Sequence, residues 1–295
     1  MEIFGIPHQA LMGQIMLGLV NGAFYAVLSM GLAIIFGLLR IVNFAHGAFF
    51  MLGAFVAFLI GRDLGLGYWP AMILAPPAVG LFRIAFGRLA LRRIYRLDPL
   101  YGLLLTFGLV LVLEGGFRVW MGSSGQPFAT PAELRGVWNL GFMILPIYRA
   151  FVILVAVVVC VSTWILIERT RMGAHLRAAT ARPELTQAFG INVPLLLTLT
   201  YGAGVALAGL AGVLAAPIQH VNPSMGSDLV IIVFAIVVIG GLGSVLGSAV
   251  TGLGLGVIEG LAKVYYSEAS TTVVFLVMAL VLLLRPAGLF GREEG

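Results

Sequence analysis

The sequence predicts an all-α protein that crosses a membrane several times, and three observations support this fold class. Hydrophobic residues make up 61% of the chain and charged residues only 10%, whereas soluble domains are about 25% charged. The apolar residues form runs long enough for membrane helices, not the alternating strands of a barrel. The 39 glycines suit helices that pack closely in a membrane. We expect one transmembrane domain over residues 1–295, with about eight hydrophobic segments and seven to nine crossings.

Four hydrophobic segments are expected in the first 120 residues. They cover residues 11–39, residues 44–60, a run that begins at residue 70, and residues 100–119. Arg40 and Asn43 separate the first two segments. The third contains Pro76 and Pro77, which predict a kink because proline lacks the backbone N–H that a helix needs.

Arginine-rich loops set the expected orientation. Five arginines lie between the third and fourth segments with only Asp98 opposing them: Arg83, Arg88, Arg92, Arg93 and Arg96. Such loops stay in the cytoplasm. The balanced loop 120–149 carries Ser, Gly and Pro turn signals and is expected in the periplasm. A fifth segment, 151–167, returns the chain to the cytoplasm, which places the N-terminus in the periplasm and the C-terminus, with Arg285 and Arg292, inside.

The last third of the chain contains one interrupted segment. Segments at 195–216 and 271–284 flank an apolar stretch, 229–261, which Gly-Gly-Leu-Gly-Ser breaks at 240–244. The orientation requires this stretch to cross twice or not at all. Two crossings need short half-helices that meet at the break, and the alternative is a re-entrant hairpin. No internal repeat is clear in the sequence, although chains of this class can contain an inverted repeat that the sequence hides.

Small residues at every fourth position predict close helix packing in three segments. The series are Gly18, Gly22 and Ala26; Gly204, Ala208, Gly212 and Ala216; and Ser244, Ser248, Gly252, Gly256 and Gly260.

The largely polar stretch 168–194 contains signals for a short helix. Pro183 suits the first helical turn, and Glu184 suits the positive end of the helix dipole. Gly190 favours the left-handed conformation that ends a helix. Arg182 occupies the N-cap position, where Ser, Thr, Asp or Asn would cap better.

Leu185, Ala188 and Phe189 share one face of this short helix. The stretch is either a basic loop that only fixes orientation or a docking helix that presents Leu185 and Phe189 to a cytoplasmic partner. Glu114 and Glu259 each precede a basic residue by four positions, Arg118 and Lys263, so both are expected in ion pairs. Because no unpaired acid is left at mid-span, proton coupling is disfavoured, which favours the docking interpretation.

Six residues are candidates for a solute pathway: Asn21, Asn43, His46, Gly241, Gly243 and Ser244. The first three are polar and lack a charged neighbour, and interhelical hydrogen bonding is the alternative role for them. The last three belong to the break, where unpaired backbone at membrane depth is tolerated only inside protein or beside a cavity.

Signatures of catalysis and of metal binding are missing from the sequence. It contains no Walker A, HExxH or GxSxG pattern, and Cys160 is its only cysteine. We therefore expect no enzyme activity, no metal and no cofactor on this chain. The net charge of +5 is attributed to cytoplasmic loops rather than to nucleic-acid binding. The first nine residues lack the basic region of a cleaved signal peptide.

Several separated stretches resemble the permeases of branched-chain amino-acid ABC transporters, and most closely their H-type subunit. These stretches are RIVNFAHGAFFMLGAF (40–55), RTRMGAHLRAATARPELTQAFGINV (169–193), IVVIGGLGSVLGSAVTGLGLGVIE (236–259) and RPAGLFG (285–291). The resemblance covers essentially the whole chain. Many members carry an acidic residue after NFAHG, where this chain has Ala48 and Phe49.

The resemblance implies a multi-pass permease subunit of an ATP-driven importer for branched-chain or related hydrophobic amino acids in the bacterial inner membrane. The implied partners are two cytoplasmic ATPase subunits that bind ATP and magnesium, a second and different permease chain, a periplasmic solute-binding protein and membrane lipid, with no nucleic acid. The family's loop at 169–193 contacts the ATPase, which assigns coupling to Arg182, Pro183, Glu184, Leu185, Phe189 and Gly190. Similar permeases carry urea or short amides, and a stand-alone channel or secondary transporter is the other alternative.

Overall fold

The computed structural model describes residues 2–3, 6–39, 43–88 and 99–291. Within them, eight helices are long and apolar enough to cross a membrane. These are α1 (His8–Leu39), α2 (Ala45–Asp63), α3 (Tyr68–Phe86), α5 (Pro99–Met121), α6 (Ile147–Arg169), α9 (Val193–Gln219), α11 (Val245–Tyr265) and α12 (Ser270–Leu284), the last extended by the 3-10 turn Ser267–Ala269. The prediction of an all-α polytopic membrane protein is therefore confirmed. Its orientation stays a prediction, and Arg40, Arg92, Arg93, Arg96, Asp98 and Arg292 lie outside the described residues.

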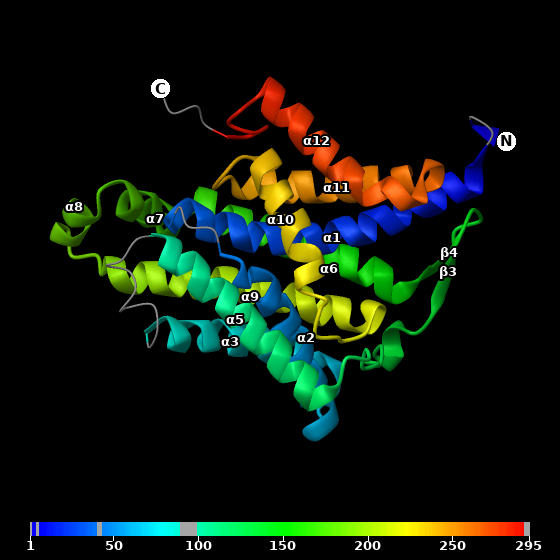
Figure 1. Cartoon of the computed structure of the whole chain (residues 1–295), viewed down its shortest axis with the longest axis horizontal. Coiled ribbons are helices and arrows are strands. Elements are labelled where there is room, and N and C mark those ends of the chain that lie inside the picture. Colours follow the sequence, from blue (N-terminus) through cyan, green and yellow to red (C-terminus); the bar gives the residue numbers. More distant parts are fainter. Residues whose placement is uncertain (1, 4–5, 40–42, 89–98, 292–295) are drawn as a thin grey trace.

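Shorter elements connect or cap these helices. They are the helices α7 (Arg171–Ala181), α8 (Pro183–Ala188) and α10 (Ser227–Gly240), the 3-10 turn Ala132–Leu134, and the strands β1 (Glu2–Ile3), β2 (Ile6–Pro7), β3 (Val137–Asn139) and β4 (Ile144–Pro146). The strands β1 and β2 pair antiparallel, as do β3 and β4, in which Trp138 lies opposite Leu145. The N-terminus and the β3–β4 hairpin lie at one end of the long axis, here named the hairpin end, and α7 and α8 lie at the other, the α8 end (Figure 1).

The helices form two halves that repeat with inverted direction (Figure 1). The helices α1, α2, α3 and α5 correspond in order to α9, α10, α11 and α12, and each runs opposite to its counterpart. The contacts correspond as well: α1 packs on α11 as α9 packs on α3, and α2 packs on α5 as α10 packs on α12. Gly31 of α1 and Gly204 of α9 meet backbone to backbone, and a Cβ at Gly204 would lie 2.8 Å from the Gly31 carbonyl oxygen. No repeat was evident at the level of sequence, and inverted repeats of this kind are typical of transporters.

Glycines let the central helices touch through their backbones, as the small-residue series predicted. On α1, Gly18 and Gly22 face Gly256 of α11 so closely that a Cβ on any of the three would meet backbone atoms of the opposite helix. A Cβ on Gly53 of α2 would likewise meet the backbone of Gly209 in α9. Close backbone approach maximises van der Waals contact, which holds membrane helices together where the hydrophobic effect between them is weak.

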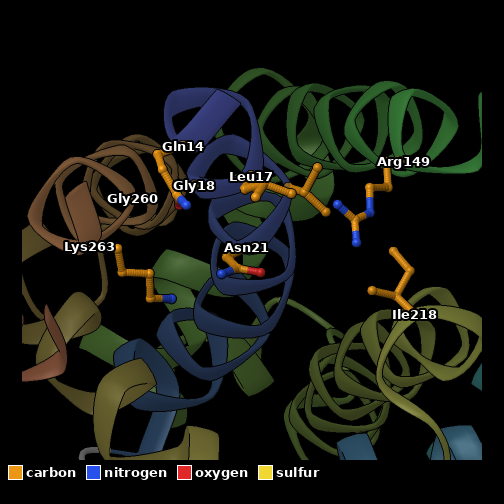
Figure 2. Close-up of a pocket in the computed structure, with 9 residues that line it drawn as sticks. Gln14, Leu17, Gly18, Asn21, Arg149, Ile218, Gly260 and Lys263 are labelled. Carbon is orange, nitrogen blue, oxygen red and sulfur yellow. The ribbon is translucent and has the colours of Figure 1, made fainter. Parts of the chain in front are cut away.

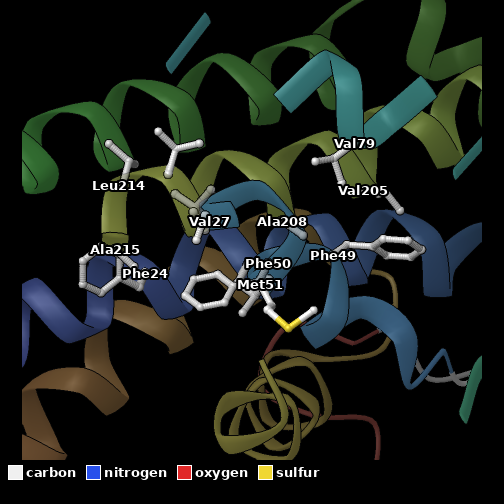
Figure 3. Close-up of a cluster of buried hydrophobic side chains, with 14 of the residues drawn as sticks. Phe24, Val27, Phe49, Phe50, Met51, Val79, Val205, Ala208, Leu214 and Ala215 are labelled. Carbon is white, nitrogen blue, oxygen red and sulfur yellow. The ribbon is translucent and has the colours of Figure 1, made fainter. Parts of the chain in front are cut away.

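The core lies around α1, α2 and α9. Figure 3 shows Phe24 of α1 and Phe50 of α2 among the buried apolar side chains of this region, with Val205 of α9 and Val79 of α3 closing it. Over its most apolar window α1 is 83% buried, whereas α5 and α12 are each 11% buried. The helices α5 and α12 therefore lie at the periphery of the bundle.

The interrupted segment is resolved as α10 and α11, which run in opposite directions from the break at 241–244 (Figure 1). Gly241 and Gly243 adopt φ angles of 99° and 83°, which side chains with a Cβ rarely tolerate, and the Ser244 hydroxyl caps α11 by accepting from the Gly247 N–H at 3.0 Å. The glycine break was therefore predicted correctly. Of the two alternatives, short half-helices match α10, with 14 residues, but not α11, which has 21 and continues to Tyr265, and the way in which this stretch crosses the membrane stays a prediction.

One of the two predicted ion pairs, between Glu114 and Arg118, does not form. Glu114 does not pair with Arg118 but accepts a hydrogen bond from the Ser227 hydroxyl at the start of α10, and Arg118 is exposed. The fold brings Ser227 beside α5 from 113 positions away along the chain, and local spacing carries no information about such a partner. Pro76 and Pro77 lie inside α3 without ending it.

Gly256 and Gly254 provide a matched test of the glycine contacts, because only Gly256 faces α1 and Gly254 has nothing within 4 Å of a Cβ position. Gly256→Ala is expected to lower the free energy of unfolding of the purified protein by about 1–3 kcal/mol, and with it the melting temperature, because the added methyl group overpacks the contact. Gly254→Ala should leave stability unchanged or raise it by up to roughly 1 kcal/mol. Melting of both variants in detergent, followed by size-exclusion chromatography, checks this. Equal melting temperatures would contradict the proposed role of the contact.

Candidate coupling surface and solute pathway

The helix α8 forms at the residues that the sequence indicated. It begins at Pro183 after Arg182, whose backbone is non-helical at φ −142°, and no side chain caps it. Instead, the Arg182 carbonyl oxygen accepts from both the Thr186 N–H at 3.1 Å and the Thr186 hydroxyl at 2.9 Å. Gly190 ends the turn at φ +84° and donates its N–H to Gln187 O at 2.9 Å. The helix is thus fixed at both ends despite its short length.

The apolar face of α8 is exposed at the α8 end. Leu185 is 51% exposed and Phe189, which follows the last helical residue, is 86% exposed, whereas Thr186 is buried. The helix α7 supports α8 and contacts both α6 and α9, and it buries Leu176 and Ala179. Large exposed apolar side chains on a well-supported turn outside the membrane helices form a surface suited to a protein partner.

Asn43 and His46 tie the start of α2 to the neighbouring helices. The Asn43 amide donates to the Tyr201 hydroxyl of α9 at 2.7 Å, and its oxygen accepts from the Ala45 N–H at 3.1 Å. The fully buried His46 ring bonds through Nε2 to the Leu28 carbonyl oxygen of α1 at 2.9 Å, and its Nδ1 has no partner among the described residues. These two residues therefore join α1, α2 and α9.

Arg83, which was expected in a cytoplasmic loop, lies in α3 and is only 6% exposed. The expectation is wrong for this residue. Its guanidinium is buried because it stacks on the Tyr201 ring, 3.9 Å from the ring centroid. Cation–π contact of this kind compensates part of the cost of removing the charge from water. Arg83, Tyr201 and Asn43 thus form one buried polar cluster, of which the sequence indicated only Asn43.

The break at 241–244 is covered by the end of the chain. Leu289 and Phe290 donate their N–H groups to Ile239 O at 2.8 Å and to Gly240 O at 3.2 Å, and the Gly241 backbone packs against Gly291. On the other side, Gly243 packs against Gly37 of α1. Two of the stretches that carried the family resemblance therefore lie in contact. The last two carbonyl groups of α10 are thus paired with backbone of the closing segment.

Asn21 lies elsewhere, in a cavity of about 290 Å³ toward the hairpin end (Figure 2). The cavity is bordered by the ends of four helices: Gln14, Leu17 and Asn21 come from α1, Arg149 from α6, Ile218 from α9 and Lys263 from α11. Figure 2 shows Asn21 near the centre, with the Arg149 and Lys263 side chains pointing toward it from opposite sides. Since α1 rises about 1.5 Å per residue, Asn21 is about 10 Å along the helix from Leu28, where His46 binds.

The predicted ion pair between Glu259 and Lys263 is confirmed, with Nζ and Oε1 separated by 2.7 Å. Glu259 is only 4% exposed, and its second carboxylate oxygen accepts from the Tyr25 hydroxyl of α1 at 2.8 Å. Tyr25 was missed because its partner lies 234 positions away in the sequence.

The structure therefore separates the six candidate pathway residues into three places: Asn43 with His46, the break with Ser244, and Asn21 in the cavity. Which of them contact solute stays a prediction. Arg149 had appeared only as part of a balanced loop, and Gln14 carried no signal beyond its polarity. Among the described residues no group of three His, Cys, Asp or Glu side chains is placed to hold a metal ion.

Comparison with known proteins assigns the chain. Residues 14–284 match the family model described as "Branched-chain amino acid transport system / permease component". The chain is 31% identical to the high-affinity branched-chain amino acid transport system permease protein LivH of Escherichia coli K12, over 94% of each chain. It is also 31% identical to the corresponding protein BraD of Pseudomonas aeruginosa, over 95% of this chain and 96% of BraD.

A more distant relative is the probable branched-chain amino acid transport permease protein LivH of Methanocaldococcus jannaschii, at 25% identity over 90% of this chain and 88% of that protein. No solved structure matches. The family match covers nearly the whole helical bundle, including both halves of the inverted repeat and the helices that connect them. This chain belongs to the family of branched-chain amino acid transport system permease components.

Proposed function

We propose that this chain is one of two permease subunits of an ATP-driven importer that carries branched-chain or related hydrophobic amino acids across a bacterial inner membrane. The similarity to LivH and BraD, which are branched-chain amino acid transport permeases, supports the solute class. The observation that carries the proposal is α8, a short helix in contact with α7 that exposes Leu185 and Phe189 beyond the membrane helices. A permease driven by a separate ATPase needs such a surface, and a stand-alone channel does not.

The α8 end faces the cytoplasm in this proposal, because Arg169, Arg171, Arg177 and Arg182 gather there. Each of two ATPase subunits, which hold the ATP and magnesium, docks on one permease, and Arg182, Pro183, Glu184 and Gly190 set the geometry of the docking turn. The hairpin end then faces the periplasm and receives solute from a binding protein. Part of the exposed apolar surface of α5, α6 and α12 meets a second permease chain, and the rest meets lipid.

The contacts of α7 provide the route by which ATP binding on the partner drives transport through this chain. ATP binding can drive the pathway only if it favours one packing of the helices over another through different contacts in each. The helix α7 contacts α6, α8 and α9, so a shift of α8 is transmitted to the connector between the two inverted halves and to the first helix of the second half. The two halves then rearrange about the α1–α9 crossing, and this chain performs no covalent chemistry and holds no cofactor of its own.

Leu185→Asp and Phe189→Asp are expected to release the ATPase while leaving membrane insertion intact. Each substitution removes apolar contact area worth about 1.5–3 kcal/mol and places an unpaired charge in the docking surface, so ATPase recovery should fall at least tenfold. Quantitative mass spectrometry of subunits that co-purify with the tagged permease from membranes measures this. Amino-acid uptake by the same cells should fall in parallel.

Val137→Asp is the matched control, because Val137 is 61% exposed on β3 at the opposite end of the molecule. Its ATPase recovery should equal that of the wild type. Wild-type ATPase recovery by both α8 variants would remove the docking proposal. Uptake that persists when the chain is expressed without any ATPase would favour a channel or secondary transporter instead.

Alanine at Asn43 or His46 should lower both uptake and thermal stability, because each side chain joins α2 to another helix. Asn21→Ala should lower uptake with little loss of stability, since Asn21 makes no hydrogen bond to another described side chain or backbone group. Uptake assays and melting curves on the three variants separate these roles. Three variants with normal uptake and unchanged solute preference would exclude all three residues from the pathway.

A further inference from the structure

We propose that the cavity at the hairpin end binds the amino-acid head group of the solute, with Arg149 receiving its carboxylate. The inference rests on the proposed function, because it takes the transported solute to be an amino acid and the hairpin end to be the side of entry. It goes further by naming the chemistry that recognises the solute inside this chain.

Two cationic side chains line the cavity, Lys263 and Arg149, and within the described residues only one of them is paired with an acidic side chain. Lys263 is paired with Glu259 at 2.7 Å, and Glu259 is held in turn by Tyr25. Arg149, which is half-buried, has no acidic side chain within ion-pair distance among the residues that the structure describes. The cavity therefore keeps one uncompensated positive charge. A planar guanidinium binds a carboxylate through two parallel hydrogen bonds, which makes an anionic group its best match.

The amide side chains of Gln14 and Asn21 complement an ammonium group. Neither forms a hydrogen bond to another group in the described part of the chain, so their carbonyl oxygens are available as acceptors. Figure 2 shows Asn21 between Arg149 and Lys263, and both the Asn21 amide and the Arg149 guanidinium line the same cavity. An α-amino acid carries an anionic and a cationic group on one carbon, and this arrangement offers a partner to each.

The remaining walls are apolar. Leu17, Val20 and Ile218 line the cavity beside the polar residues and would contact an aliphatic side chain. The volume of about 290 Å³ lies just below the usual range for small-molecule sites, which is about 300 to 1,000 Å³. The cavity therefore suits a single small amphiphilic solute.

Two other ligand classes fit less well. Urea and short amides are neutral, so they would leave the Arg149 charge unpaired. A lipid phosphate would draw on both cations, but Lys263 is already engaged by Glu259. The chemistry of the cavity therefore favours a zwitterionic amino acid over the amide substrates of similar permeases.

The test measures equilibrium binding of radiolabelled leucine to the assembled permease pair and ATPases in lipid nanodiscs, without the binding protein. Unlabelled leucine should compete, whereas leucinamide, which lacks the carboxylate, should compete at least tenfold more weakly. Arg149→Gln should weaken leucine binding at least tenfold, and Arg149→Lys should weaken it less. Arg118→Gln is the matched control, because Arg118 is exposed near the end of α5 and does not line the cavity.

Equal competition by leucine and leucinamide, or equal binding by Arg149→Gln and Arg118→Gln, would overturn the inference. If Arg149→Gln does not fold, the ligand comparison on the wild type and the Arg149→Lys variant decide. Phospholipid retained in an Arg149-dependent manner, with no saturable leucine binding, would reassign the cavity to a lipid headgroup. Uptake by the wild-type importer with its binding protein is measured in parallel. Uptake without leucine binding rejects only this inference, whereas no amino-acid uptake rejects the proposed function.

Discussion

Backbone contact between α1 and the second half of the molecule is the interaction on which the rest of the structure depends. Gly18 and Gly22 admit the backbone of α11, and Gly31 admits that of α9, so one helix lies in direct contact with two partners that are more than 170 positions away in sequence. Lipid gives helices little hydrophobic reason to associate, and dense van der Waals contact replaces that force. The two inverted halves cross where Gly31 of α1 meets Gly204 of α9, so this contact also fixes how one half packs against the other.

The functional features are arranged along this axis. Near the hairpin end, α1 contributes Gln14, Leu17 and Asn21 to the cavity. Farther along, Leu28 binds His46 at the start of α2, beyond which Asn43, Tyr201 and Arg83 form a buried polar cluster. The α6–α7–α8 connector joins the two halves and carries the exposed turn at the opposite end. The helix α1 thus runs from the cavity at the hairpin end toward the α8 end, where the coupling surface lies.

Features that depend on local sequence could be predicted, and features that depend on distant partners could not. The helical segments, the break at 241–244 and the capping of α8 follow from apolar runs, glycine and proline, all of which act within a few residues. The inverted repeat remained hidden because it is a relation between helix packings. Arg83 carried the same local signal as a loop arginine, and its burial depends on Tyr201 of α9. Asn21 was recognised alone, but its cavity requires Arg149 and Lys263 from two other helices.

The contact between the chain's closing segment and the break has a consequence for biosynthesis. The carbonyl groups of Ile239 and Gly240 receive their hydrogen bonds from Leu289 and Phe290, which the ribosome adds 50 positions later. Until then, these two carbonyl oxygens at the end of α10 lack the donors that they have in the finished fold. The turn between α10 and α11 therefore reaches its final hydrogen-bonded form only after α12 and the segment that follows it have been made.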